Sequence, residues 1–155
     1  MRERSTGDVV ANVHAELYLH LVWATLGRLP MITGETQRRV YLAIADQCRK
    51  TKSEILAVGG IADHVHVLAR IPPTISVAEL ARRLKGASSH AASHAIRTDE
   101  PFRWQASYGA FTVSRSVVPR VRTYVLEQER HHGDGRLSRV LETTEAGPTQ
   151  PRSPL

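Results

Sequence analysis

Two apolar segments of strand length lie close together in the middle of the chain and restrict what it can fold into. Residues 54–61 (EILAVGGI) and residues 64–71 (HVHVLARI) are separated by two residues. So short a connection favours an antiparallel hairpin, because parallel strands need a long crossover. Pro72 and Pro73 are expected to end the second strand, since proline cannot donate to a strand ladder.

The hairpin lies within a longer alternation of strand-like and helix-like patterns. This order is that of a ferredoxin-like sandwich, an α+β fold in which helices pack on a mostly antiparallel sheet, with an extra C-terminal helix. Such a fold hosts many functions, so function must be argued from the site. The expected elements are a strand over 16–25, a helix over 35–50, the hairpin, a helix from Ser76, a strand over 107–114, a helix over 116–132 and a short helix over 136–141.

Apolar spacing predicts which faces of the first two helices turn inward. Val40, Ile44 and Cys48 recur at helical spacing and form one inward stripe of the first helix. Ser76 and Glu79 fit a capping box, in which each side chain satisfies a free amide of the first turn. The inward stripe of the second helix is expected to hold Val77, Leu80, Leu84 and Ala91.

The chain of 155 residues fits one domain. We expect a flexible N-terminus over 1–10, a folded domain over 11–142 and a disordered, proline-rich tail over 143–155. The single cysteine, Cys48, excludes an internal disulfide. Neither a signal peptide nor an apolar run of membrane-spanning length is evident, so a cytoplasmic protein without a membrane partner is the expectation.

The charge balance favours a polyanionic partner. Lys and Arg number 21 against 15 Asp and Glu, and the net charge of +6 accompanies a pI near 10.1. Nucleic acid is the first candidate for such a chain. Arg82, Arg83 and Lys85 cluster on the second helix as candidate phosphate contacts, although a solvated basic face would have the same composition.

His64 and His66 stand at the start of the second hairpin strand. Residues two apart on a strand point to the same face, so both imidazoles can reach one divalent metal ion. Val65 and Val67 then face the opposite core. Taken alone, the pattern also fits two surface histidines on a half-buried strand.

Tyr124 and Gln128 are four residues apart on the third expected helix and therefore share a face. Val117 and Val121 extend that face, so it is expected to pack inward. A phenol has an ordinary pKa of about 10, and a nearby divalent cation would lower it. The amide oxygen of Gln128 can complete the metal coordination. An ordinary core tyrosine beside a solvent-facing glutamine would fit the same spacing.

Five collinear segments give the chain a specific resemblance. They are His20-Leu21-Val22-Trp23 with Arg28 beyond it, residues 62–68 (ADHVHVL), residues 82–86 (RRLKG), Trp104-Gln105 with residues 108–114 (YGAFTVS), and residues 124–132 (YVLEQERHH). With these segments the chain resembles the single-tyrosine HUH transposases, named for histidine, hydrophobe, histidine. This family includes small insertion-sequence transposases and REP-associated tyrosine transposases.

The resemblance implies a complete set of roles. His64, His66 and Gln128 would hold Mg²⁺ or Mn²⁺, and Tyr124 would attack a DNA phosphate to form a 5′-phosphotyrosine. The implied partners are single-stranded DNA with hairpin-containing element ends and a second copy of the chain. In several relatives, the tyrosine helix of one subunit completes the site of the other.

One departure from the family pattern concerns DNA contacts. Many relatives carry a lysine before the arginine that follows the first strand, whereas this chain has Leu26-Gly27-Arg28. Arg28 is retained as a candidate DNA contact, with one phosphate contact fewer than in those relatives.

Two alternatives are weighed against the enzyme. His90 and His94 are four apart and have the spacing of a zinc pair, but exposed helix histidines are the preferred interpretation because no glutamate lies between them. The other function is a non-catalytic module of the same fold that binds single-stranded nucleic acid. Such a module needs no His, His, Tyr and Gln set in this register.

Overall fold

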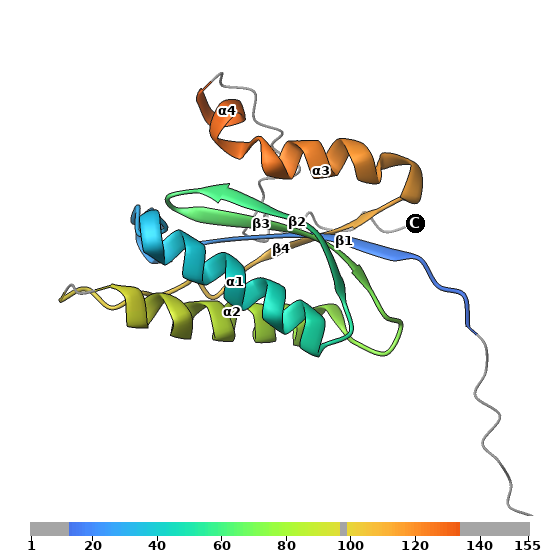
Figure 1. The fold of residues 1–155 in the computed structure, drawn as a ribbon, viewed down its shortest axis with the longest axis horizontal. Coiled ribbons are helices and arrows are strands. Elements are labelled where there is room, and N and C mark those ends of the chain that lie inside the picture. The colour runs from blue at the N-terminus through green and yellow to red at the C-terminus, as the bar shows by residue number, and fades with distance from the viewer. Residues whose placement is uncertain (1–12, 97–98, 134–155) are drawn as a thin grey trace, which may run out of the picture.

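A computed structural model describes residues 13–96 and 99–133 of the chain. In Figure 1, α1 and α2 lie side by side on one face of a sheet, and α3 and α4 lie on the other. The elements are β1 (Leu17–Ala24), η1 (Leu26–Arg28), α1 (Gly34–Lys50), β2 (Glu54–Ile61), β3 (His64–Ile71), α2 (Val77–Ala95), β4 (Gly109–Val113), η2 (Arg115–Val117), α3 (Val118–Leu126) and α4 (Gln128–Gly133).

The four strands form an antiparallel sheet in the order β2-β3-β1-β4. This is the ferredoxin-like arrangement that the order of elements predicts. The predicted hairpin is confirmed, since β2 and β3 pair along their lengths with a register shift between Ile55 and Ala57. Val22 of β1 lies opposite His66 of β3, and this register places the N-terminal end of β3 beside the C-terminal end of β1.

The larger core lies between the sheet and the pair α1 and α2. It is built by the inward stripes of both helices and by alternate residues of β1 and β3, among them Leu21, Trp23, Val65 and Val67. The predicted stripe of α1 is confirmed: its Val40, Ile44 and Cys48 are buried in this core. On α2, Ala92 is buried where the sequence pattern suggested Ala91.

A smaller core lies on the opposite face, beneath α3. Ala57 and Leu68 of the sheet pack there against Val121 and Val125 of the helix. Because both faces are covered, seven of the eight residues of β3 are buried, with only Arg70 partly exposed. A histidine placed on either face of this strand is therefore removed from water.

The helix predicted over 116–132 is two helices. Glu127 leaves helical geometry, with φ −102° and ψ 26°, and separates α3 from α4. Val117 belongs to the short 3-10 turn before α3 and is 40% exposed, so it does not extend the inward face as expected. Pro119 falls in the first turn of α3, where its missing amide costs no helical hydrogen bond.

The cap of α2 is half of the predicted capping box. The Ser76 hydroxyl accepts a hydrogen bond from the Glu79 amide at 3.1 Å. The Glu79 carboxylate turns outward and accepts hydrogen bonds from Arg82 and Arg83. An exposed guanidinium pair thus competes successfully for the carboxylate that would have closed the box.

Three predicted segments lie outside the described residues: the N-terminus over 1–10, the short helix over 136–141 and the tail over 143–155. Of the helices that the structure describes, none has the length and apolar character needed to cross a membrane.

Candidate active site

His64 and His66 lie on the face of the sheet that α3 and α4 cover. The strand period turns both imidazoles the same way, as predicted, and their ring centroids are 5.0 Å apart. Their exposed fractions are 1% and 0%, which excludes the interpretation as surface histidines. Two imidazoles at this depth need polar partners, because burying a polar group without a hydrogen bond is costly.

The Asp63 carboxylate fixes the orientation of His64. The His64 Nδ1 donates to Asp63 Oδ1 at 2.7 Å, since an ionised carboxylate can only accept. In the neutral ring, the lone pair is then on Nε2. That nitrogen lies 3.4 Å from the Oε1 of Gln128.

Gln128 presents its amide oxygen to His64 because its amide nitrogen is held elsewhere. The Gln128 Nε2 donates to the carbonyl of Tyr124 at 3.1 Å, which assigns the other end of the amide as oxygen. Gln128 is 1% exposed, so it is not the solvent-facing residue of the alternative interpretation. The imidazole nitrogen of His64 and the amide oxygen of Gln128 are therefore within hydrogen-bonding distance in a buried site, and both atom types are also ligands of divalent metal ions.

The chemistry of this donor set fits a divalent metal ion. Imidazole nitrogen and amide oxygen are both metal ligands, and a site with few protein donors leaves coordination positions for substrate. Across the described residues there is no cluster of three or more His, Cys, Asp or Glu side chains suited to a metal. Any ion here would depend on the Gln128 oxygen as well as on the two imidazoles.

Tyr124 approaches the histidines from α3. Its ring is half-buried and stands edge-on to the ring of His66 at a centroid distance of 5.7 Å. Val121 and Val125 anchor the same helix in the smaller core. The two residues of α3 and α4 and the two of β3 are thus assembled within one chain.

His20 of β1 is a member of this group to which the sequence analysis assigned no role. It is fully buried, and its Nε2 lies 2.8 Å from the Nδ1 of His66. In the sequence, His20 is marked only as a histidine in a mostly apolar strand and as part of the first segment that carries the family resemblance. Sheet register is needed to place it beside His66.

The cations predicted to contact DNA occupy two different places. Arg28 lies at the active-site end of β1, where its guanidinium is 3.9 Å from Asp63 Oδ1. Arg82 and Arg83 lie on α2, across the sheet from the histidines, and both bond to Glu79. Hydrogen bonds from Arg82 and Arg83 lower the pKa of Glu79 to about 2.

Lys85 has a role within the fold. Its ammonium donates to three backbone carbonyls that follow one another in the chain, at distances between 2.6 and 3.1 Å, and so ties α2 to the segment before β4. Burial lowers the pKa of this amine. The three acceptors are those of Gln105, Ala106 and Ser107.

His90 and His94 are exposed on α2, as the preferred interpretation of their spacing has it. Their ring centroids are 4.4 Å apart, and the His94 Nδ1 donates to the His90 carbonyl at 2.8 Å. The pair is on the helix layer opposite α3, so it takes no part in the group around His64.

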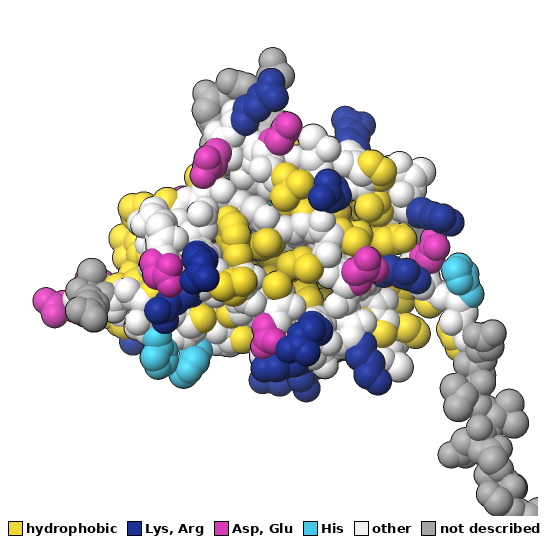
Figure 2. Space-filling model, viewed as in Figure 1, with side chains coloured by type: hydrophobic (Ala, Val, Ile, Leu, Met, Phe, Trp, Pro, Cys, Tyr) yellow, Lys and Arg dark blue, Asp and Glu magenta, His cyan; other side chains and the backbone are white. Residues whose placement is uncertain are grey.

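Basic side chains occur on the helices of both layers. In Figure 2, dark blue basic side chains and magenta carboxylates are seen over the upper and the lower helices. Helix α3 itself carries Arg120 and Arg122 and has no acidic residue in its sequence. Arg120 is four residues before Tyr124, so the two side chains are neighbours on the helix.

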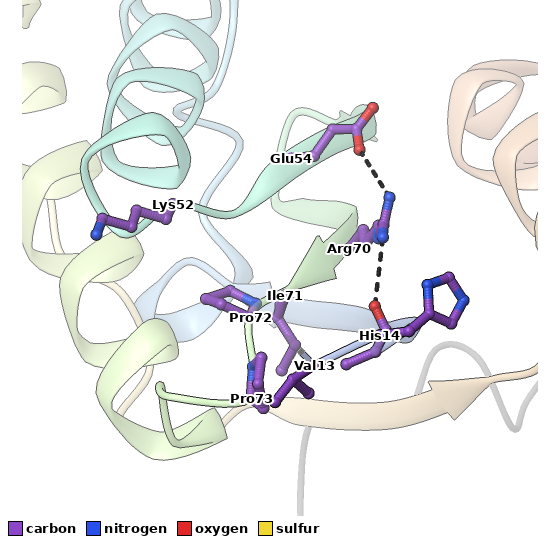
Figure 3. A pocket seen from close by; sticks show the side chains of 9 residues that line it. Val13, His14, Lys52, Glu54, Arg70, Ile71, Pro72 and Pro73 are labelled. Carbon is purple, nitrogen blue, oxygen red and sulfur yellow. Dashed lines mark hydrogen bonds and ion pairs between the residues drawn. The ribbon is translucent and has the colours of Figure 1, made fainter. Parts of the chain in front are cut away.

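A hollow of about 320 Å³ lies at the other end of β3 from His64 (Figure 3). Arg70 reaches across it, donating to the Ala15 carbonyl at 3.3 Å and pairing with Glu54 at 4.0 Å. One contact ties β3 to the segment before β1, and the other ties β3 to β2. The charge of Arg70 is thus used within the fold, and the candidate chemistry remains with the buried histidines.

Sequence comparisons relate this chain to known transposases. The family model described as "Transposase IS200 like" matches residues 13–128, well over half of the chain. The transposases for insertion sequence element IS200 of Salmonella typhimurium and Salmonella typhi are each 37% identical to this chain over 70 residues. That match spans 45% of this chain and 46%, or about half, of each relative.

Solved structures show the same fold. A candidate transposase from Deinococcus radiodurans superposes with a TM-score of 0.62 and 23% identity, over 81% of this chain and 95% of its own. A REP-associated tyrosine transposase bound to a REP hairpin gives a TM-score of 0.60 and 15% identity, over 99% and 96%. Fold and family model together identify this chain as a member of the IS200-like transposase family.

Proposed function

We propose that this chain is a metal-dependent transposase that cleaves and rejoins single-stranded DNA through a covalent 5′-phosphotyrosine at Tyr124. The observation that carries the proposal is the buried contact of His64 Nε2 with Gln128 Oε1 at 3.4 Å, next to His66 and the ring of Tyr124. A module that only binds nucleic acid gains nothing from such an arrangement, which costs desolvation energy.

His64, His66 and Gln128 would hold the divalent ion, Mg²⁺ or Mn²⁺. When bound, the ion would polarise the scissile phosphate and favour the phenolate form of a nearby tyrosine. Orientation of the metal ligand and of the nucleophile depends on side chains of this chain. Asp63 keeps His64 in the tautomer with its lone pair on Nε2, and α3 holds the Tyr124 ring over the histidines.

Cleavage is an exchange of one phosphodiester for another. The Tyr124 oxygen forms a bond to phosphorus, the bond from phosphorus to the 3′ oxygen breaks, and the leaving 3′ oxygen takes up a proton. The phenol proton passes to water. In rejoining, a 3′-hydroxyl attacks the phosphotyrosine and Tyr124 leaves, so the bond energy is conserved without a nucleotide cofactor.

The DNA would be held at two places. Near the reacting phosphate, Arg120 lies on α3 with Tyr124, and Arg28 lies in η1 with its guanidinium 3.9 Å from Asp63. Farther away, the Arg82 and Arg83 pair on α2 would contact a more distant part of the strand, such as the stem of a hairpin. Lys85 is proposed as a contact beside them, although its carbonyl bonds limit its reach.

The decisive experiment is covalent trapping. The protein is incubated with Mn²⁺ and single-stranded DNA that carries hairpins and a label on the 3′ side of candidate cleavage sites. A labelled adduct that survives denaturation and is lost with Tyr124→Phe supports the proposal. Cleavage without an adduct would indicate a hydrolytic nuclease, and tight binding without cleavage would favour the binding module.

We also propose that the working form is a homodimer. Since Tyr124 and the histidines meet within one chain, each subunit is expected to hold its own complete site. Mixed dimers of His64→Ala and Tyr124→Phe chains should then stay inactive, because each site lacks one group. Restored cleavage on mixing would show that α3 is exchanged between subunits, and light scattering would report the assembly itself.

A further inference from the structure

His20 is the one buried histidine of the group that the proposed function leaves without a role. Val22 is opposite His66 in the sheet, and His20 is two residues before Val22 on β1. His20 therefore lies on the same face as His66 and is its diagonal neighbour. The two rings stack with centroids 5.0 Å apart and an interplanar angle of 11°. A direct bond of 2.8 Å joins His20 Nε2 to His66 Nδ1.

Neighbouring rings hold His20 in this position. The ring centroid of Phe111 in β4 lies 6.0 Å from that of His20, and the ring of Tyr124 in α3 stands edge-on to His20 at a centroid distance of 6.3 Å. The His20 side chain has no exposed surface. Rotation toward solvent would require the displacement of α3, so the contact with His66 is fixed by packing on a strand and not by a mobile loop.

The bond between the two imidazoles decides which nitrogen of His66 can bind a metal. One proton occupies a bond between two neutral rings. If His66 donates from Nδ1, its lone pair is on Nε2, and the ring can ligate an ion there. If His20 donates instead, the proton of His66 is on Nε2, and that nitrogen cannot be a ligand.

Asp63 sets the tautomer of His64, the other proposed imidazole ligand. It accepts from Nδ1 of His64 and leaves Nε2 as the metal-facing nitrogen. Partners of this kind orient metal-ligating histidines and set their tautomers. In this site one such partner is a carboxylate next in sequence, and the other is an imidazole 46 residues away in the chain.

We propose that His20 is a positioning residue: it accepts the Nδ1 proton of His66 and so presents Nε2 of His66 to the divalent ion. The inference rests on the proposed metal role of His66. It adds a fourth buried side chain to the machinery of the site, one that touches neither metal nor DNA. Its effect is on metal affinity and ring orientation.

The direct test is the ring ¹⁵N spectrum of the metal-free protein, which reports the tautomer of each histidine. Wild type should show His66 protonated on Nδ1. His20→Leu should convert His66 to a mixture of tautomers, whereas His64, held by Asp63, should keep its own and serve as an internal control for the fold. A wild-type His66 protonated on Nε2 would overturn the proposal.

Metal affinity provides the second readout. Mn²⁺ binding, followed by electron paramagnetic resonance, should weaken in His20→Leu by roughly 10- to 100-fold, the range for losing such a partner. His20→Gln places an amide oxygen near the position of the lost nitrogen and should restore most of the affinity. Equal affinities in wild type and His20→Leu would refute the role.

Failure of this inference and failure of the proposed function are distinguishable. If no phosphotyrosine adduct forms but His20→Leu changes the His66 tautomer and Mn²⁺ affinity, His20 positions a metal ligand in a protein without that activity. If adducts form normally and the tautomer of His66 is unaffected by His20→Leu, the function stands and the positioning role fails. Should His20→Leu not fold, the wild-type spectrum still decides which nitrogen is protonated.

Discussion

Gly59 of β2 lies directly beneath the backbone of Val125 in α3. A Cβ added to Gly59 would overlap the Val125 carbonyl oxygen and lie 3.0 Å from its carbonyl carbon. A backbone atom cannot move aside by changing rotamer, so only glycine allows the helix to lie this close to the sheet. This contact sets the height of Tyr124 and Gln128 above the histidines.

Gly59→Ala is therefore expected to lift α3 and separate Gln128 from His64. A shift of about 1 Å at a reacting group can cost roughly 100-fold in rate. DNA cleavage should fall by that order while circular dichroism retains the spectrum of the folded domain. Gly86→Ala is the matched control: a Cβ there meets nothing within 4 Å, and in the middle of α2 it should stabilise by about 0.5–1 kcal/mol. Unchanged cleavage by Gly59→Ala would show that α3 docks elsewhere during catalysis.

Removal of either proposed imidazole ligand should abolish metal binding and cleavage together. His64→Ala deletes the imidazole nitrogen that faces Gln128. His66→Ala deletes the second proposed imidazole ligand, two residues along β3. Calorimetric titration with Mn²⁺ and a cleavage assay measure the two effects. His90→Ala changes an exposed imidazole across the sheet and should leave both at wild-type values. Normal cleavage by His64→Ala would contradict the site.

Tyr124→Phe is expected to bind DNA normally and to cleave none. The ring remains and little volume is lost, so packing against His66 should hardly change. Phosphate contacts supply most of the affinity and are untouched. Tyr41→Phe, which loses a half-buried hydroxyl on α1, is the control and should cleave at the wild-type rate. Residual cleavage by Tyr124→Phe would assign the attack to water.

Binding to DNA should weaken steeply as salt rises, because each phosphate contact releases counterions. Single strands and hairpins with unpaired bases should bind more tightly than blunt duplex. Arg120→Ala should reduce the salt slope by about one contact and also slow cleavage, whereas Arg82→Ala should affect affinity alone. Fluorescence anisotropy over a salt series measures the slopes. A preference for blunt duplex would count against a single-stranded substrate.

Cys48 is expected to resist alkylation until the chain unfolds. Burial raises the pKa of its thiol from 9.0 to about 11, so at pH 8 hardly any reactive thiolate is present. The folded form holds the proton more tightly than the unfolded chain. This contribution to stability is therefore complete below pH 9 and decreases as the pH rises toward 11. Rapid alkylation of the native protein at pH 8 would show that α1 opens locally, and Cys48→Ala should reduce the alkaline loss by the part that Cys48 contributes.

Relationships between residues close in the sequence could be predicted from backbone geometry. Strand alternation put His64 and His66 on one face, a two-residue connection required the hairpin, and helical spacing gave the inward stripe of α1. The four-residue spacing of Tyr124 and Gln128 predicted a shared inward face, and both do face the site, but the two residues lie on different helices. Each of these relationships joins residues that are close in sequence, where the backbone fixes direction by itself.

Other features came only from tertiary structure. The break at Glu127 allows Gln128 to reach His64, and the register of β1 against β3 brings His20 to His66. The Glu79 carboxylate accepts hydrogen bonds from two arginines and not from the helix cap. The Lys85 ammonium donates to three carbonyls in a segment about 20 residues away. In each case several partners of similar chemistry were available to the same side chain. Only the packed sheet and helices determine which of them lies within hydrogen-bonding distance.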